Sequence, residues 1–205
     1  MKNILVTQTV LYSKKRGYAF ALSKDWTDYA KKIGFNLIPY NYYFSNKFFE
    51  KMKIDGVIFS GGNDLHLKKR NKENIFRDAN EIRLFKYFFK KKIPILCVCR
   101  GFQLIAYYFK STLKFSKNHV RKKHNLNIEK SKYTKNLKLK VNSFHNYCIH
   151  SLSKKFNIVA RHKDQSIEMA EHKHKRISCI MFHPERKNGS QKQVDNFFKL
   201  FFKIK

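Results

Sequence analysis

Short segments made almost wholly of apolar residues alternate with amphipathic segments along this chain. Apolar segments of this kind are typical of strands in a parallel sheet, because helices cover both faces of such a sheet. We predict these strands at residues 3–7, 36–40, 55–60, 94–98 and 177–182. We predict helices at residues 21–33, 75–92, 101–109 and 193–204, with a helical turn at 48–52. The alternation predicts an α/β fold with three layers, α/β/α, around a mainly parallel sheet.

Three of the predicted helices carry an apolar stripe at helical spacing. The stripes expected to face the sheet are Trp26, Tyr29, Ala30 and Ile33 in the first, Ile82, Phe85, Phe88 and Phe89 in the second, and Val194, Phe197, Phe198 and Phe201 in the last. Gly34 stands where a helix commonly ends on glycine. Residues 114–160 mix short β-like runs with basic turns and predict no clear elements. No linker or repeat divides the sequence, so we expect a single domain over residues 1–205.

The formal net charge of +31 raises the question of a nucleic-acid partner. Only nine of the 45 basic residues are arginine, the residue type that reads bases and binds phosphate through paired hydrogen bonds. The lysines are scattered along the whole chain and no nucleic-acid-binding motif is present, so we expect no nucleic-acid partner. A positive field would instead attract an anionic small substrate. Association into a homo-oligomer stays open.

No apolar run approaches the ~20 residues that a membrane span requires. The N-terminus also lacks the apolar core and the cleavage site of a signal peptide. The four cysteines, Cys97, Cys99, Cys148 and Cys179, show neither a plausible disulfide framework nor the spacing of metal ligands. We therefore expect a cytoplasmic protein with free thiols and no membrane partner.

Cys99 directly follows the predicted strand 94–98 and precedes the predicted helix 101–109. A tight turn between a strand and a helix lifts a nucleophile above the sheet, and the helix N-terminus favours the thiolate. The backbone N–H of Arg100 would then point towards a developing oxyanion, and Gly101 would let the helix approach the strand closely. Taken alone, Cys99 is explained about as well as a buried core cysteine.

Two further polar motifs follow predicted strands. His183 and Glu185 come directly after residues 177–182, and they offer an imidazole to take the cysteine proton and a carboxylate to orient that imidazole. The turn Ser60-Gly61-Gly62-Asn63-Asp64 lacks the spacing of a phosphate loop, but its N–H groups suit an incoming ligand, and Gly62 would be a second oxyanion donor. Ligands collect at the carboxyl ends of parallel strands, so we expect the three motifs to meet.

The order of these motifs, glycine loop, cysteine turn and His-x-Glu, resembles the class I glutamine amidotransferase-like superfamily over nearly the whole chain. The resemblance implies a flavodoxin-like arrangement of the sheet. Within the superfamily the sequence is similar to the γ-glutamyl hydrolase branch, which includes γ-glutamyl-γ-aminobutyrate hydrolase. The details that carry this are Asn63-Asp64 after the glycines, Arg100-Gly101 after the cysteine, Arg77-Asp78 with Glu81, and Val141-Asn142-Ser143-Phe144-His145.

The resemblance implies a cysteine-dependent hydrolase that releases glutamate from a γ-glutamyl amide and uses no cofactor or metal. Cys99 would be the nucleophile, His183 the general base and then acid, and Glu185 the orienting carboxylate. The backbone N–H groups of Gly62 and Arg100 would form the oxyanion hole. The glutamyl α-amino and α-carboxylate groups would be held by Gln103 and by the backbone of Ser143, Phe144 and His145.

The leaving group is the least constrained part of this hypothesis. The short chain and the basic loops, among them residues 120–123 between His119 and His124, look similar to hydrolases of γ-glutamyl-CDP-amidate in capsule biosynthesis. The alternatives are a γ-glutamyl-γ-aminobutyrate hydrolase, a glutaminase subunit of an amidotransferase, and a binding module without activity.

One feature departs from the resemblance, and two others have a second interpretation. Cys97 stands where the family usually has glycine, and its Cβ would crowd the turn, although we interpret Cys97 as a packing residue. Arg77 and Glu81 are explained equally well as an ion pair on a helix surface. His172-Lys173-His174 suggests a metal site, but no further ligands are evident, so a solvated basic turn is the better interpretation.

Overall fold

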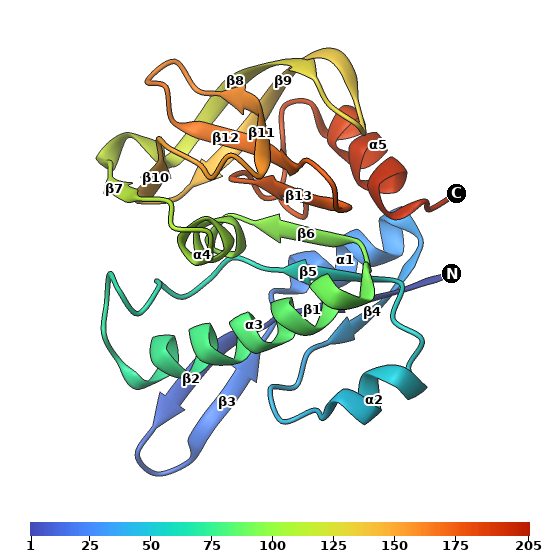
Figure 1. The fold of residues 1–205 in the computed structure, drawn as a ribbon, viewed down its shortest axis with the longest axis vertical. Coiled ribbons are helices and arrows are strands. Elements are labelled where there is room, and N and C mark those ends of the chain that lie inside the picture. Colours follow the sequence, from blue (N-terminus) through green and yellow to red (C-terminus); the bar gives the residue numbers. More distant parts are fainter.

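A seven-stranded sheet forms the middle of the structure, a computed structural model that describes residues 1–205 apart from the side chains of Glu129, Lys135 and Asn136. The strand order is β11–β12–β13–β6–β5–β1–β4 (Figure 1). The strands are β1 (Lys2–Val6), β4 (Phe35–Pro39), β5 (Gly56–Phe59), β6 (Ile95–Val98), β11 (Phe156–Arg161), β12 (Ile167–His172) and β13 (Ile177–Ile180). The stretch from β4 to β13 is parallel, while β12 and β11 run antiparallel at one edge. The predicted mainly parallel α/β fold is confirmed.

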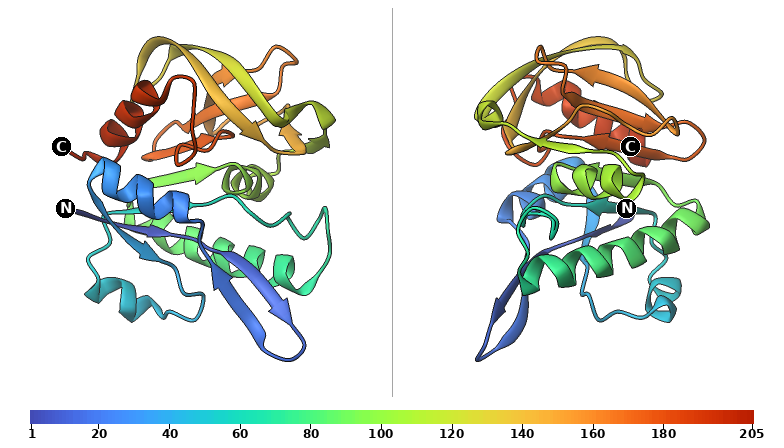
Figure 2. Two further views of the ribbon diagram at one scale, coloured as in Figure 1. Left: turned by 180° about the vertical axis from the view of Figure 1, so that it is seen from behind. Right: turned by 60° about the vertical axis from the view of Figure 1, so that its left-hand side comes forward.

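Helices cover both faces of this sheet (Figures 1 and 2). On one face α2 (Asn46–Lys51), α3 (Lys72–Lys91) and α4 (Arg100–Tyr108) share a buried apolar cluster with the sheet. On the other face α1 (Lys24–Ile33) and α5 (Gln191–Phe202) share a second cluster. These two clusters make the layered arrangement stable, because each helix buries its apolar side against the strands.

Three two-stranded ribbons complete the fold. The first pairs β2 (Thr9–Ser13) with β3 (Gly17–Ala21), and the second pairs β7 (Leu113–Phe115) with β10 (Tyr147–Ile149). After a short 3₁₀ helix, η1 (Lys117–His119), the third pairs β8 (Val120–Lys130) with β9 (Lys135–Phe144). The β8–β9 ribbon lies over the same face as α5 and contributes Leu126, Ile128, Leu139 and Val141 to that core. These ribbons account for much of the region that the sequence left unassigned.

The predicted apolar stripes of the first and last helices are confirmed, and so is Gly34, which ends α1 in a left-handed conformation. The helix predicted from residue 21 begins only at Lys24, because Ala21 still pairs in β3 and Ser23 caps the helix. The helix predicted from residue 75 begins one turn earlier, where the Asn71 side chain caps it by accepting from the Asn74 N–H.

The predicted inward stripe of α3 is confirmed for Phe85 and Phe88, which are buried, and for Phe89, which is half-buried and packs against the same core. Ile82 is half-buried and lies outside that core cluster. The buried side also includes charged residues at the N-terminal end of the helix, Arg77, Asp78 and Glu81. The apolar pattern could not show this, because these charges are buried by pairing with one another. Along the described residues, no helix combines the length and the apolar composition that crossing a membrane requires.

Candidate active site

The three polar motifs lie together at the carboxyl ends of the parallel strands. They follow β5, β6 and β13, which are adjacent and parallel, so their carboxyl ends point the same way. Ser60 and Gly61 come directly after β5, Cys99 after β6, and His183 three residues after β13. The expected meeting of the motifs therefore follows from strand order alone.

Cys99 forms the turn between β6 and α4 in a strained backbone conformation. Its φ of 50° and ψ of −105° place it in a region that residues other than glycine rarely adopt. The turn is held tightly, because a Cβ on Gly101 would lie 2.2 Å from the backbone oxygen of Phe59 in β5. Arg100 is the first residue of α4, where a backbone N–H has no acceptor within the helix. The turn thus presents a sulfur and a free N–H side by side.

The His183 ring is fixed by contacts on both sides. Its Nδ1 lies 2.7 Å from Oε1 of Glu185, and both side chains are almost fully buried. Gly61 lies directly against the ring, since a Cβ there would be 2.6 Å from Cε1 of His183. Gly62 follows, exposed and with a φ of 114°. The glycines are needed here for close approach and for a left-handed turn.

The electrostatics of the pair favour a charged imidazole. Burial lowers the pKa of His183, but the Glu185 carboxylate and the nearby Cys99 sulfur outweigh it and raise this pKa to about 10. A proton on His183 at neutral pH is what a thiolate–imidazolium pair requires.

Asn142 of β9 holds the backbone of His183 in place, a role that the sequence did not suggest. Its Oδ1 accepts from the His183 N–H at 2.9 Å, and its Nδ2 donates to the His183 carbonyl at 2.8 Å. Asn188 supports the same turn, donating to that carbonyl at 3.0 Å. The β8–β9 ribbon thereby sets the position of the histidine. No sequence spacing signals such a contact, because Asn142 and His183 are 41 residues apart.

A buried ion network joins the glycine loop to the start of α4. Arg77 donates to Glu81 at 2.8 Å and to the backbone oxygen of Gly61 at 2.9 Å. Arg100 donates to the other oxygen of Glu81 and to Asp78. Arg77, Glu81 and Arg100 are at most 1% exposed, so the interpretation as a surface ion pair is wrong. The network locks the two candidate oxyanion donors, Gly62 and Arg100, into one rigid unit.

The predicted substrate-binding residues differ in what their side chains do. Gln103 donates to the Tyr147 carbonyl at 2.9 Å. Ser143 is buried and donates to the backbone oxygen of His119, while His145 is buried 3.5 Å from Glu168. Only Phe144 reaches both solvent and the candidate site, with 38% exposure and its ring edge-on to His183. Binding by Ser143 and His145 would fall to their backbone, as predicted.

The burial of Cys97 and of His172 bears on what the sequence predicted for each. Cys97 lies in the core within β6, opposite Cys179 of β13. Burial raises the pKa of the Cys97 thiol, which agrees with a packing role. His172 is buried and its Nδ1 accepts from the N–H groups of His174 and Lys175, so the expected solvated turn is wrong for this ring.

Comparison with known proteins places the chain in a family. The sequence model of the peptidase C26 family matches residues 47–185, more than half of the chain, from α2 to Glu185. The chain belongs to the peptidase C26 family. The matched region contains the glycine loop, the cysteine turn and the histidine motif, so the predicted resemblance to class I glutamine amidotransferase-like proteins is confirmed.

Individual relatives of this peptidase C26 member agree. A gamma-glutamyl-CDP-amidate hydrolase of Campylobacter jejuni is 35% identical over 181 residues, which cover 87% of this chain and 85% of that protein. A solved structure described as a GMP synthase subunit from Thermoplasma acidophilum superimposes with a TM-score of 0.76 at 19% identity, covering 99% of this chain and 93% of that one. A glutamine amidotransferase of Thermotoga maritima gives a TM-score of 0.71 at 12% identity, covering 98% and 96%. The two structures show the shared fold.

Proposed function

We propose that this chain is a cysteine hydrolase that cleaves γ-glutamyl amide bonds, with Cys99, His183 and Glu185 as its catalytic residues. The observation that carries the proposal is that the Cys99 turn and the His183–Glu185 pair, whose side chains lie 2.7 Å apart, follow adjacent parallel strands. The raised pKa of His183, caused by Glu185 and Cys99, supports it. The family and the Campylobacter jejuni relative support the same reaction class.

In the proposed mechanism the Cys99 thiolate attacks the γ-carbonyl carbon of the substrate. The N–H groups of Gly62 and Arg100 hold the oxyanion that forms. His183 gives its proton to the leaving nitrogen, the C–N bond breaks, and a γ-glutamyl thioester stays on Cys99. Water, deprotonated by His183, then attacks the thioester, and glutamate leaves as the thiolate is restored. Glu185 keeps the imidazole oriented and stabilises its charged form.

We propose γ-glutamyl-CDP-amidate as the substrate, as in the relative from Campylobacter jejuni. The surface around Phe144 suits an anionic leaving group that carries a base. The Arg186 guanidinium lies 4.7 Å from the Phe144 ring centroid, and Lys122 and Lys123 are exposed where β8 pairs with Ser143 and Asn142 of β9. An aromatic face stacks on a base and cations bind phosphate. A role in capsule biosynthesis within the cytoplasm belongs to the same proposal.

The test is a glutamate-release assay on γ-glutamyl-CDP-amidate, γ-glutamyl-γ-aminobutyrate and glutamine. The variants are Cys99→Ser and, as a matched control from the preceding strand β6, Cys97→Ala. We expect release from the nucleotide amidate at the highest kcat/KM, its loss in Cys99→Ser, and its retention in Cys97→Ala. Preference for γ-glutamyl-γ-aminobutyrate or for glutamine would reject the substrate but keep the chemistry. Equal rates for wild type and Cys99→Ser on every substrate would reject the hydrolase.

A further inference from the structure

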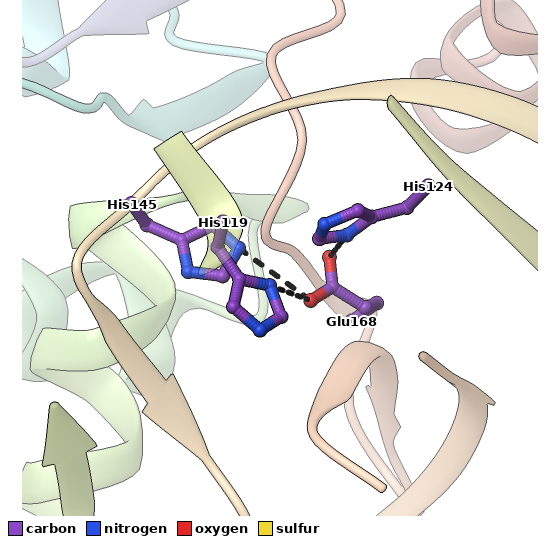
Figure 3. A group of neighbouring side chains, drawn as sticks. All are labelled: His119, His124, His145 and Glu168. Atoms are coloured by element: carbon purple, nitrogen blue, oxygen red, sulfur yellow. Dashed lines mark ion pairs between the residues drawn. The ribbon is translucent and has the colours of Figure 1, made fainter. Parts of the chain in front are cut away.

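A second cluster of polar side chains, separate from Cys99, lies buried between the β8–β9 ribbon and the sheet. It consists of His119 at the end of η1, His124 in β8, His145 just after β9, and Glu168 in β12. All four are at most 3% exposed. Figure 3 shows the three imidazole rings turned towards the one carboxylate from separate segments of the chain. A group of this kind needs something to balance its buried polar atoms.

The separations between these atoms are those of ligands around one metal ion. Glu168 oxygens lie 3.2 Å from Nδ1 of His124, 3.5 Å from Nε2 of His145 and 3.7 Å from Nδ1 of His119. Zinc bonds of roughly 2.0–2.2 Å at tetrahedral angles put neighbouring ligand atoms about 3.3–3.6 Å apart. The four residues each offer one ligand atom within 4.8 Å of the others. The four ligand atoms are therefore close enough together for one ion to bind all four residues.

Most of these atoms lack hydrogen-bond partners among the described residues, although Oε1 of Glu168 accepts from the Ser166 hydroxyl at 3.4 Å. Nδ1 of His119, both ring nitrogens of His124, Nε2 of His145 and Oε2 of Glu168 are buried without one. His124 and Glu168 are close enough for a hydrogen bond, so the absence of one reflects the direction of their atoms. These buried nitrogens and this oxygen would gain a partner if a cation lay among them.

The surroundings of His119 fix which nitrogen faces that centre. Its Nε2 lies 2.7 Å from Asp164, whose other oxygen accepts from the Ser166 N–H and hydroxyl. A proton on Nε2 leaves Nδ1 as a lone pair facing the Glu168 carboxylate, an unfavourable arrangement unless a cation lies between them. A carboxylate behind a ligating histidine is the usual support of a metal site. His162 stacks on the His124 ring at 4.1 Å and holds that ligand in place.

We propose that His119, His124, His145 and Glu168 bind a structural Zn²⁺ ion. Three imidazoles and a carboxylate suit zinc, and four protein ligands in a buried setting leave no open position for substrate. The two carboxylates, Glu168 and Asp164, balance the charge of the ion. The site ties the β8–β9 ribbon to β12 of the sheet, because His124 lies in β8 and Glu168 in β12. That ribbon also carries Asn142, which positions His183.

The zinc content of the purified protein tests this proposal, and the result does not depend on whether the chain is a hydrolase. The full chain, without a histidine tag, is produced with added zinc, purified without chelator and analysed by mass spectrometry for metals. We expect about one zinc per chain. We expect His124→Ala and Glu168→Gln to hold at least about tenfold less, and Asp164→Asn to bind zinc roughly 10–100-fold more weakly. The exposed His174→Ala is the matched control and should keep its zinc.

Cobalt provides a measurement that needs no variant to fold. Wild-type protein stripped with a chelator is titrated with Co²⁺, and we expect the visible absorption bands of a tetrahedral site, which added Zn²⁺ removes. Wild type that holds no zinc and gives no such bands would overturn the proposal and leave an ion-paired histidine cluster. Zinc retained in folded His124→Ala and Glu168→Gln at the wild-type level would also overturn it.

Discussion

Replacing Gly101 with alanine should disturb the cysteine turn without removing any reacting atom. The added Cβ would lie 2.2 Å from the Phe59 backbone oxygen and 2.8 Å from the Phe59 carbonyl carbon. Neither backbone atom can rotate away, so α4 has to retreat from β5. Ordinary van der Waals contacts begin at 3.4 Å, whereas the new Cβ would lie 2.2 Å from the Phe59 oxygen, so α4 has to move away by the difference, about 1.2 Å.

That displacement has two measurable consequences. Overpacking of this size costs about 1–3 kcal/mol in the free energy of unfolding, partly offset by up to ~1 kcal/mol that alanine gains from helix propensity. Because Cys99 precedes the helix, its sulfur moves with α4 relative to His183. A shift of about 1 Å in a reacting group lowers kcat by roughly 100-fold. We therefore expect a modest loss of stability with a large loss of rate.

Urea unfolding and steady-state glutamate release measure the two effects on the same preparation. Gly189→Ala is the comparison variant, because its Cβ would crowd side-chain atoms, Cγ, Cβ and Cδ of Lys140 at 2.8–2.9 Å, instead of a strand backbone. We expect Gly189→Ala to lower the free energy of unfolding by about 1–3 kcal/mol while its kcat stays close to that of wild type. A Gly101→Ala protein with wild-type kcat and unfolding midpoint would refute the close contact of α4 with β5.

Three further predictions concern the groups that hold the site. Asn142→Ala leaves the His183 N–H buried without its acceptor and should lower the free energy of urea unfolding by about 2–4 kcal/mol; an unchanged midpoint would contradict the contact. Glu81→Ala leaves two buried guanidiniums without this partner and should cost about 3–5 kcal/mol in the same assay, whereas the exposed Glu50→Ala should cost little. Because the pKa of His183 is raised to about 10, its charged form stabilises the fold fully below about pH 6.5 and progressively less up to about pH 10. The free energy of unfolding of wild type should therefore fall across this pH range more than that of His183→Gln. An equal fall in both proteins would contradict the charged imidazole.

Much of the fold could be predicted because its signal is local. The apolar strands around Ile58, Val98 and Ile180 can be recognised directly in the sequence. Because these strands are neighbours in the sheet, the polar residues that follow them lie together. The β8–β9 ribbon was not predicted, since its partly exposed strands contain many lysines and carry little apolar periodicity. The β2–β3 ribbon was not predicted because its two strands are only five residues long and mostly exposed or half-buried.

The parts of the site that escaped prediction depend on contacts between distant residues. The buried side of α3 looks like a surface in sequence, because Arg77, Asp78 and Glu81 are charged and only their pairing with Arg100 allows burial. The histidine cluster draws on two strands, a 3₁₀ helix and the turn after β9, so its members follow no metal-binding spacing.

The most direct test of the central claim is the identity of the cysteine that reacts with a γ-glutamyl electrophile. The full chain is treated with a γ-glutamyl diazoketone, digested and mapped by mass spectrometry, with and without competing γ-glutamyl substrate. We predict a single adduct on Cys99 that substrate prevents and that is lost in His183→Gln. An adduct on Cys97, Cys148 or Cys179 in place of Cys99, or no adduct at all, would contradict the proposed catalytic role of Cys99.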